Sequence, residues 1–134
     1  TPTPMKPPPT GRAILLVDHG SVKPQANDLL LEIARLVAAQ APDCHVEAAH
    51  MELAKPGIPE GIAACVKAGA TDITVVPYML APGRHSTDDI PRISIAAGEQ
   101  HQGLRLRVSA PLGVDSRLAE VILKRVEDAG SKEE

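Results

Sequence analysis

The sequence predicts a single doubly wound α/β domain built on a four-stranded parallel sheet in the order 2-1-3-4. The first observation behind this fold class is the length, since 134 residues suit one domain. The second is a regular alternation, repeated four times, of short apolar runs with segments whose apolar residues recur at helical spacing. Right-handed connections between parallel strands then place helices on both faces of the sheet.

The two ends of the chain are expected to lie outside this domain. Residues 1–11 begin TPTPMKPPPT, and five prolines in ten residues exclude a helix or a central strand. We therefore expect a disordered, proline-rich tail there. The α/β domain is expected to span residues 12–130, and residues 131–134 form a charged tail.

The first half of the domain is expected to hold two strands and two helices. Residues 13–17 form a continuous apolar run, typical of a strand covered on both faces. A helix over 24–40 follows, with Pro24 in its first turn, then a second strand over 44–49. The next helix covers 58–68 and is capped by Gly69. The side chains expected to face inward from these helices are Ala26, Leu29, Leu30, Ile33 and Val37, then Ile58, Ile62, Cys65 and Val66.

The second half repeats the pattern. A third strand is expected over 72–77 and a fourth over 104–108. The helix between them covers roughly 87–97. Because an interior proline disrupts helical hydrogen bonding, we expect either that Pro91 lies in its first turn or that the helix starts at Pro91. The last helix follows Asp115 as its N-cap and ends at Gly130. The side chains expected to face inward are Ile90, Ile93 and Ala97, then Leu118, Val121, Ile122 and Val126.

The predicted strand order is flavodoxin-like, and four strands make a small sheet, so we expect a partner to cover one edge. Composition limits the partners. A net charge of −3 and a single aromatic residue argue against nucleic-acid binding. No apolar run approaches the length of a membrane span, and we expect no secretory signal, because no charged segment followed by an apolar one appears. Two isolated cysteines, Cys44 and Cys65, fit buried thiols in a cytoplasmic protein.

Polar side chains suited to chemistry follow three of the four predicted strands. His19 follows the first, Glu52 the second and His85 the third. Ligands of open α/β sheets bind beyond the carboxyl ends of the strands, so these three side chains are expected to converge. Two imidazoles and a carboxylate suit a divalent transition metal with open coordination positions. They equally suit proton transfer near neutral pH, and the pattern alone leaves both chemistries open.

Each of these residues also has a structural interpretation. His19 could cap a loop carbonyl, Glu52 could be a surface carboxylate beside Lys55, and His85 could simply begin a helix. A nucleotide site has little support, because the sequence contains neither G-x-G-x-x-G nor G-x-x-x-x-G-K-[ST]. An FMN site would usually need aromatic stacking residues, which this sequence almost entirely lacks.

The remaining histidines are weaker candidates. His45 and His101 are interpreted as structural or surface residues. His50 lies at a strand end, but nothing else in the sequence supports a role for it. Asp18 is a candidate to orient the imidazole of His19 or to act as a cap.

Three segments carry a resemblance to a known family. They read LVDHGS at residues 16–21, MELAKP at 51–56 and VVPYMLAPGRH at 75–85. These segments resemble the class II tetrapyrrole chelatases, in particular the short CbiX/SirB-type sirohydrochlorin chelatases. The LAPGRH stretch after an apolar strand is the most specific part, and the resemblance covers nearly all of the expected domain. It implies a chelatase-type α/β domain.

The resemblance also implies a metal site and a reaction. His19 and His85 would bind the incoming metal and act in catalysis, and Glu52 would assist as a ligand or base. The divalent metal is a substrate rather than a permanently bound cofactor, with Co²⁺ favoured and Fe²⁺ or Ni²⁺ also compatible with these ligands. The expected partners are a sirohydrochlorin-like tetrapyrrole and a second copy of the chain in a homodimer.

Substrate contacts follow from the same resemblance. Arg84 is the first candidate to bind a substrate carboxylate, ahead of Lys23, Lys55 and Arg92. Val75 and Val76 are expected in the core. The side chains expected at the macrocycle are Ser21, Met51, Tyr78, Met79 and Leu80.

The sequence departs from the family pattern at two of its positions. Val22 stands where the family commonly has arginine, and Met51 where an aromatic is common, which bears on substrate choice. Two other functions remain open. One is a non-enzymatic metal or tetrapyrrole carrier on the same fold, and the other is a flavodoxin-like binding module whose histidines are only structural.

Overall fold

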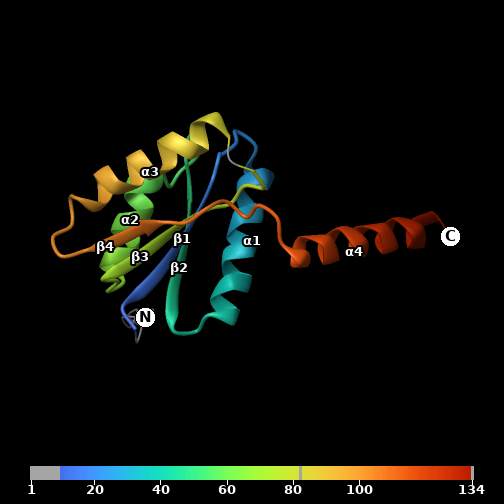
Figure 1. Ribbon diagram of the computed structural model, residues 1–134, viewed down its shortest axis with the longest axis horizontal. Coiled ribbons are helices and arrows are strands. Elements are labelled where there is room, and N and C mark those ends of the chain that lie inside the picture. The colour runs from blue at the N-terminus through green and yellow to red at the C-terminus, as the bar shows by residue number, and fades with distance from the viewer. Residues whose placement is uncertain (1–9, 82, 134) are drawn as a thin grey trace.

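Four parallel strands form the sheet in the order β2-β1-β3-β4, which confirms the predicted topology. The computed structural model describes residues 10–81 and 83–133, apart from the side chains of residues 84–87, 132 and 133 (Figure 1). The strands are β1 (Arg12–Asp18), β2 (Cys44–His50), β3 (Asp72–Pro77) and β4 (Arg105–Val108).

Helices cover the two faces of the sheet unequally. On one face, α2 (Ile58–Lys67) and α3 (Arg84–Gly98) close a large apolar core that contains Leu15 and Val75. On the other face, α1 (Pro24–Gln40) closes a smaller cluster around Leu16. Alternate residues of β1 therefore enter opposite cores, which explains the continuous apolar run in the sequence.

The predicted bounds of α1 are confirmed, but the prediction of which of its side chains face inward is partly wrong. Leu30 is 1% exposed, and Ile33 and Val37 pack beside it as predicted, whereas Leu29 is 61% exposed and Ala26 is also exposed. Because only one side of α1 meets the sheet, its buried stripe is narrower than the apolar pattern suggested. The α2 prediction is confirmed, with Ile58, Ile62 and Cys65 buried, Val66 packed against them, and Gly69 at a φ of +102° just after the helix.

The α3 helix begins three residues before the predicted start. It runs from Arg84, so Pro91 lies in its interior, and the prediction that Pro91 occupies the first turn or starts the helix is wrong. A proline there removes one helical hydrogen bond, yet Ile90 and Ala97 are buried as predicted and Ile93 packs beside them. Tertiary packing of this apolar side outweighs the lost bond.

The last helix, α4 (Ser116–Glu133), differs most from expectation. Asp115 is its N-cap as predicted, because Oδ1 of Asp115 accepts a hydrogen bond from the backbone N–H of Arg117 at 2.9 Å. Hydrogen bonds from the Arg117 side chain hold the pKa of the Asp115 carboxyl well below its usual range. The helix continues through Gly130, so the predicted end there is wrong.

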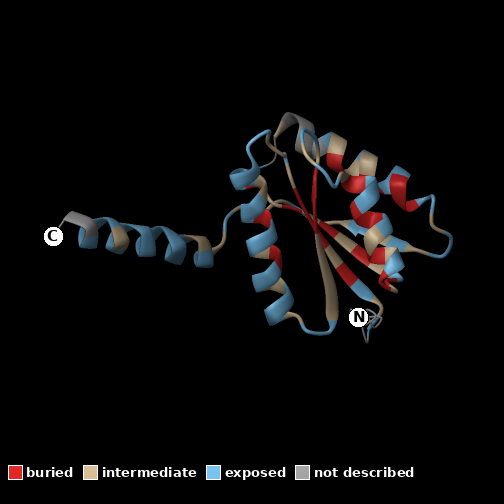
Figure 2. Cartoon of the chain, turned by 180° about the vertical axis from the view of Figure 1, so that it is seen from behind, coloured by how far each residue is buried: buried red, intermediate tan, exposed pale blue. Residues whose placement is uncertain are grey.

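The prediction that α4 packs inward is also wrong. The helix leaves the body of the domain (Figures 1 and 2), and Val121, Ile122 and Val126 are 46%, 63% and 62% exposed, while Leu118 is half-buried. Apart from Leu118, the predicted inward side of α4 is therefore left largely uncovered by the part of the chain that the structure describes. Within the described part of the chain, no helix is both long and apolar enough to cross a membrane.

Candidate functional site

The loops that follow the strands are joined to one another at the carboxyl edge of the sheet. The backbone N–H of Glu52 donates to the carbonyl of His19 at 3.1 Å, beyond the end of the β1–β2 ladder. The backbone N–H of Tyr78 donates to the carbonyl of Val17 at 2.6 Å and links the loop after β3 to β1. The loop after β4 continues this pattern, since the N–H of Leu112 donates to the carbonyl of Met79 at 2.9 Å. The four loops thus form one connected rim.

Gly20 allows the first two loops to approach closely. Its φ is +88°, and a Cβ built on it would lie 1.8 Å from the carbonyl oxygen of Glu52. Only glycine fits this contact, because any side chain would collide with the neighbouring backbone. In the loop after β2, which also carries Glu52, Leu53 is a non-glycine residue at a φ of +67°, a strained conformation of the kind that concentrates at functional sites.

The backbone around Ser21 is clamped from α1. The side-chain amide of Asn27 donates to the carbonyl of Ser21 at 2.8 Å, and its oxygen accepts from the N–H of Ser21 at 3.0 Å. The Oγ of Ser21 accepts from the N–H of Lys23 at 3.0 Å. This role of Asn27 was not predicted, although an amide one turn inside a helix that follows a glycine loop is a usable signal for such a clamp.

A buried histidine beside this loop is paired with a partly buried aspartate. The carboxylate of Asp18 accepts a hydrogen bond from Nδ1 of His50 at 2.6 Å, and the His50 side chain is only 4% exposed. Asp18 and His50 are register partners on adjacent parallel strands, so their side chains share a face. Asp18 was a candidate to orient the imidazole of His19, but its carboxylate is instead hydrogen-bonded to His50. His45 instead pairs with Glu47 at 2.8 Å, as a structural histidine would.

The three predicted metal ligands lie on loops or turns of this rim. His19 and Glu52 are exposed, so both side chains are open to an incoming ligand. His85 lies in the first turn of α3, directly after the β3 loop, and its side chain and that of Arg84 lie outside the described residues. Among the described side chains, no three of His, Cys, Asp and Glu gather closely enough to hold a metal ion. A ligand set completed by His85 thus remains a prediction.

The residues expected at the macrocycle occupy different depths. Leu80 is 67% exposed, Met51 and Tyr78 are half-buried, and Met79 is turned into the core with 9% exposure. Of these four side chains, Leu80 is therefore the most open to a ligand. Val75 is fully buried and Val76 packs against the smaller cluster, as predicted.

The side chains predicted to bind substrate carboxylates differ in their ion-pair partners and exposure. Arg92 donates to the carboxylate of Asp89 at 3.0 Å, so part of its charge is already neutralised. Lys23 and Lys55 are exposed beside the His19 and Glu52 loops.

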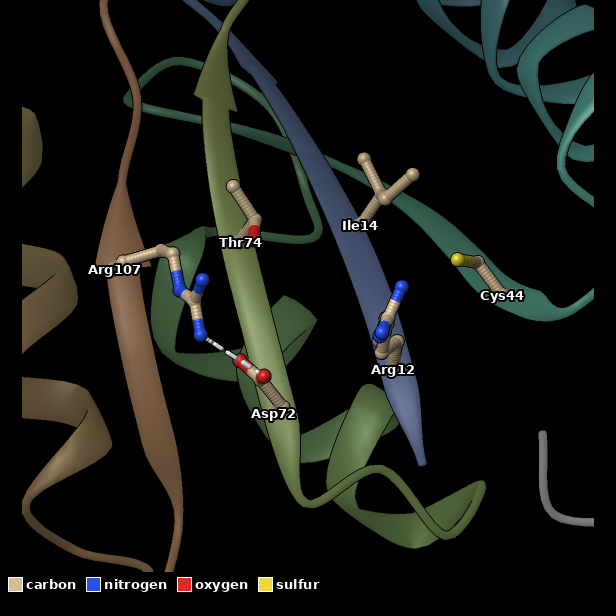
Figure 3. A pocket seen from close by; sticks show the side chains of 7 residues that line it. Arg12, Ile14, Cys44, Asp72, Thr74 and Arg107 are labelled. Atoms are coloured by element: carbon tan, nitrogen blue, oxygen red, sulfur yellow. Dashed lines mark hydrogen bonds and ion pairs between the residues drawn. The ribbon is translucent and has the colours of Figure 1, made fainter. Parts of the chain in front are cut away.

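A separate hollow of about 430 Å³ lies on the α1 face of the sheet, at the opposite end of the strands (Figure 3). It is bordered by the first residues of β1 and β3, Arg12 and Asp72, and by Ile14 and Thr74. Arg107 donates to both oxygens of Asp72 there, at 3.0 and 2.9 Å. This hollow is remote from the rim and contains no part of the predicted metal site.

The fold and the joined loops define a doubly wound α/β protein with a polar site at the carboxyl edge of its sheet. The CbiX family model matches residues 13–129, and the chain belongs to this family, as the resemblance to CbiX/SirB-type class II chelatases predicted.

Curated relatives and a solved structure agree with this family. The chloroplastic sirohydrochlorin ferrochelatase of Arabidopsis thaliana is 37% identical over 114 residues, which cover 85% of this chain and 51% of that protein. The chain thus spans about half the length of the Arabidopsis relative. The sirohydrochlorin cobaltochelatase of Methanosarcina acetivorans is 36% identical over 124 residues, covering 87% of this chain and 95% of that protein. The structure of SirB from Bacillus subtilis with Fe³⁺ matches with a TM-score of 0.79 and 32% identity, covering 89% of this chain and 47% of that one.

Proposed function

We propose that this protein inserts a divalent metal ion into sirohydrochlorin or a closely related tetrapyrrole. The observation that carries the proposal is the connected rim, which fixes the His19 and Glu52 loops together by backbone hydrogen bonds. Membership of the CbiX family and the relatives named as sirohydrochlorin chelatases support the reaction. The metal is a substrate that enters and leaves the site, with Co²⁺ favoured and Fe²⁺ or Ni²⁺ as the other candidates.

The reaction must remove two pyrrole N–H protons and strip ligands from the metal. We assign metal holding and proton relay to His19 and His85, because a neutral imidazole can either coordinate an ion or accept a proton. Glu52 completes the set as a ligand or base. The exposure of His19 and Glu52 supports a weak, open site from which pyrrole nitrogens can take the metal stepwise.

Substrate contacts are proposed on both sides of the metal. Leu80, with 67% exposure, would pack on the macrocycle face beside Met51 and Tyr78. Ser21 would contribute a polar contact, and Arg84 would bind a substrate carboxylate in a bidentate manner. Because Arg92 is already paired with Asp89, it ranks below Arg84.

We further propose that the active form is a cytoplasmic homodimer. SirB is a longer chain of which this protein covers 47%, so two copies of this chain match one SirB in length. The two free cysteines support a reducing compartment.

Spectrophotometric insertion assays with sirohydrochlorin and Co²⁺, Fe²⁺ or Ni²⁺ test the function directly. We expect the wild-type protein to accelerate at least one insertion above the protein-free rate. His19→Ala and His85→Ala should each abolish turnover with unchanged circular dichroism, while His101→Ala serves as the matched control. A protein that binds metal or tetrapyrrole without accelerating insertion would be a carrier and would contradict the proposal.

A further inference from the structure

An imidazole and a carboxylate meet at the last rung of the β1–β2 ladder, directly before the loops that carry two of the proposed metal ligands. Asp18 and His50 are register partners, and Nδ1 of His50 lies 2.6 Å from Oδ1 of Asp18. His19 is the next residue after Asp18, and Glu52 lies two residues after His50. The Asp18–His50 pair therefore lies at the base of both loops.

The pair is enclosed by the protein rather than solvated. The His50 side chain is 4% exposed and the Asp18 side chain 19%. Because side chains alternate along a strand, both lie on the sheet face covered by α1, in line with Leu16 and Ala48 of the smaller apolar cluster. Burying polar groups there costs hydration, which an apolar pair would not lose. A hydrogen-bonded pair in such a position brings little net stability, but it fixes the direction of both side chains.

The backbone of His50 also closes the loop that carries Glu52. The N–H of His50 donates to the carbonyl of Pro56 at 2.8 Å, and a parallel bridge joins His50 to Gly57. The loop over residues 51–56 therefore leaves from His50 and returns to it. Through this one residue, the bond to Asp18 anchors both ends of the loop to β1.

Backbone hydrogen bonds continue from the pair to the proposed ligands. The N–H of Met51 donates to the carbonyl of Asp18 at 2.9 Å, and the N–H of Glu52 donates to the carbonyl of His19 at 3.1 Å. Both bonds lie beyond the last register pair of the ladder, where a loop is free to move unless something below holds it. Among the described residues, the Asp18–His50 bond is the side-chain hydrogen bond that joins these two segments.

We propose that Asp18 and His50 are positioning residues, whose bond holds the His19 and Glu52 loops at the spacing that the metal ion requires. The inference rests on the proposed function, because His19 and Glu52 are its proposed ligands. Neither Asp18 nor His50 touches the metal, and each acts through the backbone of the segment that it begins. Removing a residue that orients metal ligands typically reduces metal affinity or activity about 10- to 100-fold.

Co²⁺ titration of three histidine variants tests the positioning role. His50→Ala removes the bond to Asp18, so its Co²⁺ affinity should fall about tenfold or more. His50→Asn should keep most of the affinity, because its side-chain amide N–H₂ is attached to Cγ, as Nδ1 is, and can donate to Asp18. His45→Ala is the matched control, since it removes another histidine–carboxylate bond of β2, to Glu47 at 2.8 Å, near the opposite end of the strand. Its Co²⁺ affinity should equal that of the wild type.

Amide hydrogen exchange, followed by NMR without metal, reports the position of the loop itself. The N–H of Glu52 should exchange about tenfold faster in His50→Ala, because its acceptor on His19 is no longer held in place, and at the wild-type rate in His45→Ala. Unchanged Co²⁺ affinity in His50→Ala would overturn the proposal. So would an equal loss in His50→Asn, which would show that the ring itself acts on the metal, or a loss of affinity without faster Glu52 exchange.

Steady-state insertion of Co²⁺ into sirohydrochlorin separates this inference from the proposed function. His50→Ala should lower kcat about tenfold or more while KM for sirohydrochlorin stays near the wild-type value, because the substrate contacts are untouched. A wild type that binds Co²⁺ without accelerating insertion would refute the chelatase function alone, since the Co²⁺ affinities still decide the positioning role. Equal kcat in the wild type and His50→Ala would refute the positioning role and leave the chelatase function intact.

Discussion

Replacing Gly20 with alanine should displace the loop that carries Glu52. The added Cβ would lie 1.8 Å from the carbonyl oxygen of Glu52, a separation that real Cβ atoms do not reach, so the two loops must move apart. Reaching even 3.0 Å requires a shift of at least 1.2 Å. Such a shift would break the bond from the N–H of Glu52 to the carbonyl of His19, which is 3.1 Å long.

The expected loss in the free energy of unfolding has two separable contributions, the left-handed backbone conformation and the broken loop hydrogen bond. A left-handed φ costs a non-glycine residue about 1–2 kcal/mol, partly offset by about 0.4–1 kcal/mol from the stiffer unfolded chain. Gly103 provides the matched control, because its φ is +79° but nothing lies within 4 Å of an added Cβ. Gly103→Ala should therefore cost about 1 kcal/mol or less. Gly20→Ala should cost about 1 kcal/mol more, from the lost loop hydrogen bond.

Urea unfolding and sirohydrochlorin metallation measure the two consequences. A displacement of about 1 Å at a catalytic group can reduce the rate about 100-fold, so Gly20→Ala should lose roughly that factor. Gly103→Ala should keep wild-type turnover. Equal stability losses, or full activity in Gly20→Ala, would refute the conclusion that this close approach positions Glu52.

Three further predictions concern buried groups. Asp18→Ala should lower the free energy of unfolding by about 2 kcal/mol, because Nδ1 of the buried His50 loses its acceptor. The control Asp28→Ala, at an exposed position on α1, should change the free energy of unfolding by less than about 0.5 kcal/mol. Equal urea midpoints for the two variants would contradict this role of the Asp18–His50 bond. Burial, and secondarily Glu47, raises the pKa of the Cys65 thiol from 9.0 to about 12, so its contribution to stability is complete below pH 9 and is lost as the pH rises toward 12. Mass spectrometry after iodoacetamide treatment of the native protein should find Cys44 modified and Cys65 intact, and equal modification would contradict this burial. Ser94→Ala should raise the free energy of unfolding by about 1 kcal/mol, because Oγ of Ser94 is buried without a hydrogen-bond partner among the described atoms. A lower thermal midpoint in this variant would show that the hydroxyl is hydrogen-bonded.

The sheet was predictable from the sequence because its signals are local and strong. The apolar runs of β1 and β3 and the glycine after α2 specify elements without reference to distant residues, and right-handed connections then restrict the topology. Pro91 misled the prediction for α3, since the propensity penalty of an interior proline does not reveal the compensating burial of Ile90. The outward course of α4 was unpredictable, because an apolar stripe shows that a helix needs a surface but does not say whose.

The candidate site was predictable in its positions more than in its contacts. The strand-end rule placed His19 and Glu52 on adjoining loops, and a backbone hydrogen bond joins those loops. The Asp18–His50 pair and the Asn27 clamp depend on strand register and on the first turns of α1, which local periodicity does not specify. Strand register matters here because it places Asp18 opposite His50, so that the Asp18 carboxylate meets the imidazole of His50.

The most direct test of the account is a Co²⁺ titration, followed by visible absorption, of the wild type, His19→Ala, His85→Ala and the double variant. If both imidazoles hold one ion at the rim, each single substitution should weaken Co²⁺ binding at least tenfold. The double variant should then lose much less than the two single losses combined, because their contributions are coupled. Strictly additive losses, or wild-type affinity in His85→Ala, would show that the two histidines do not share a metal.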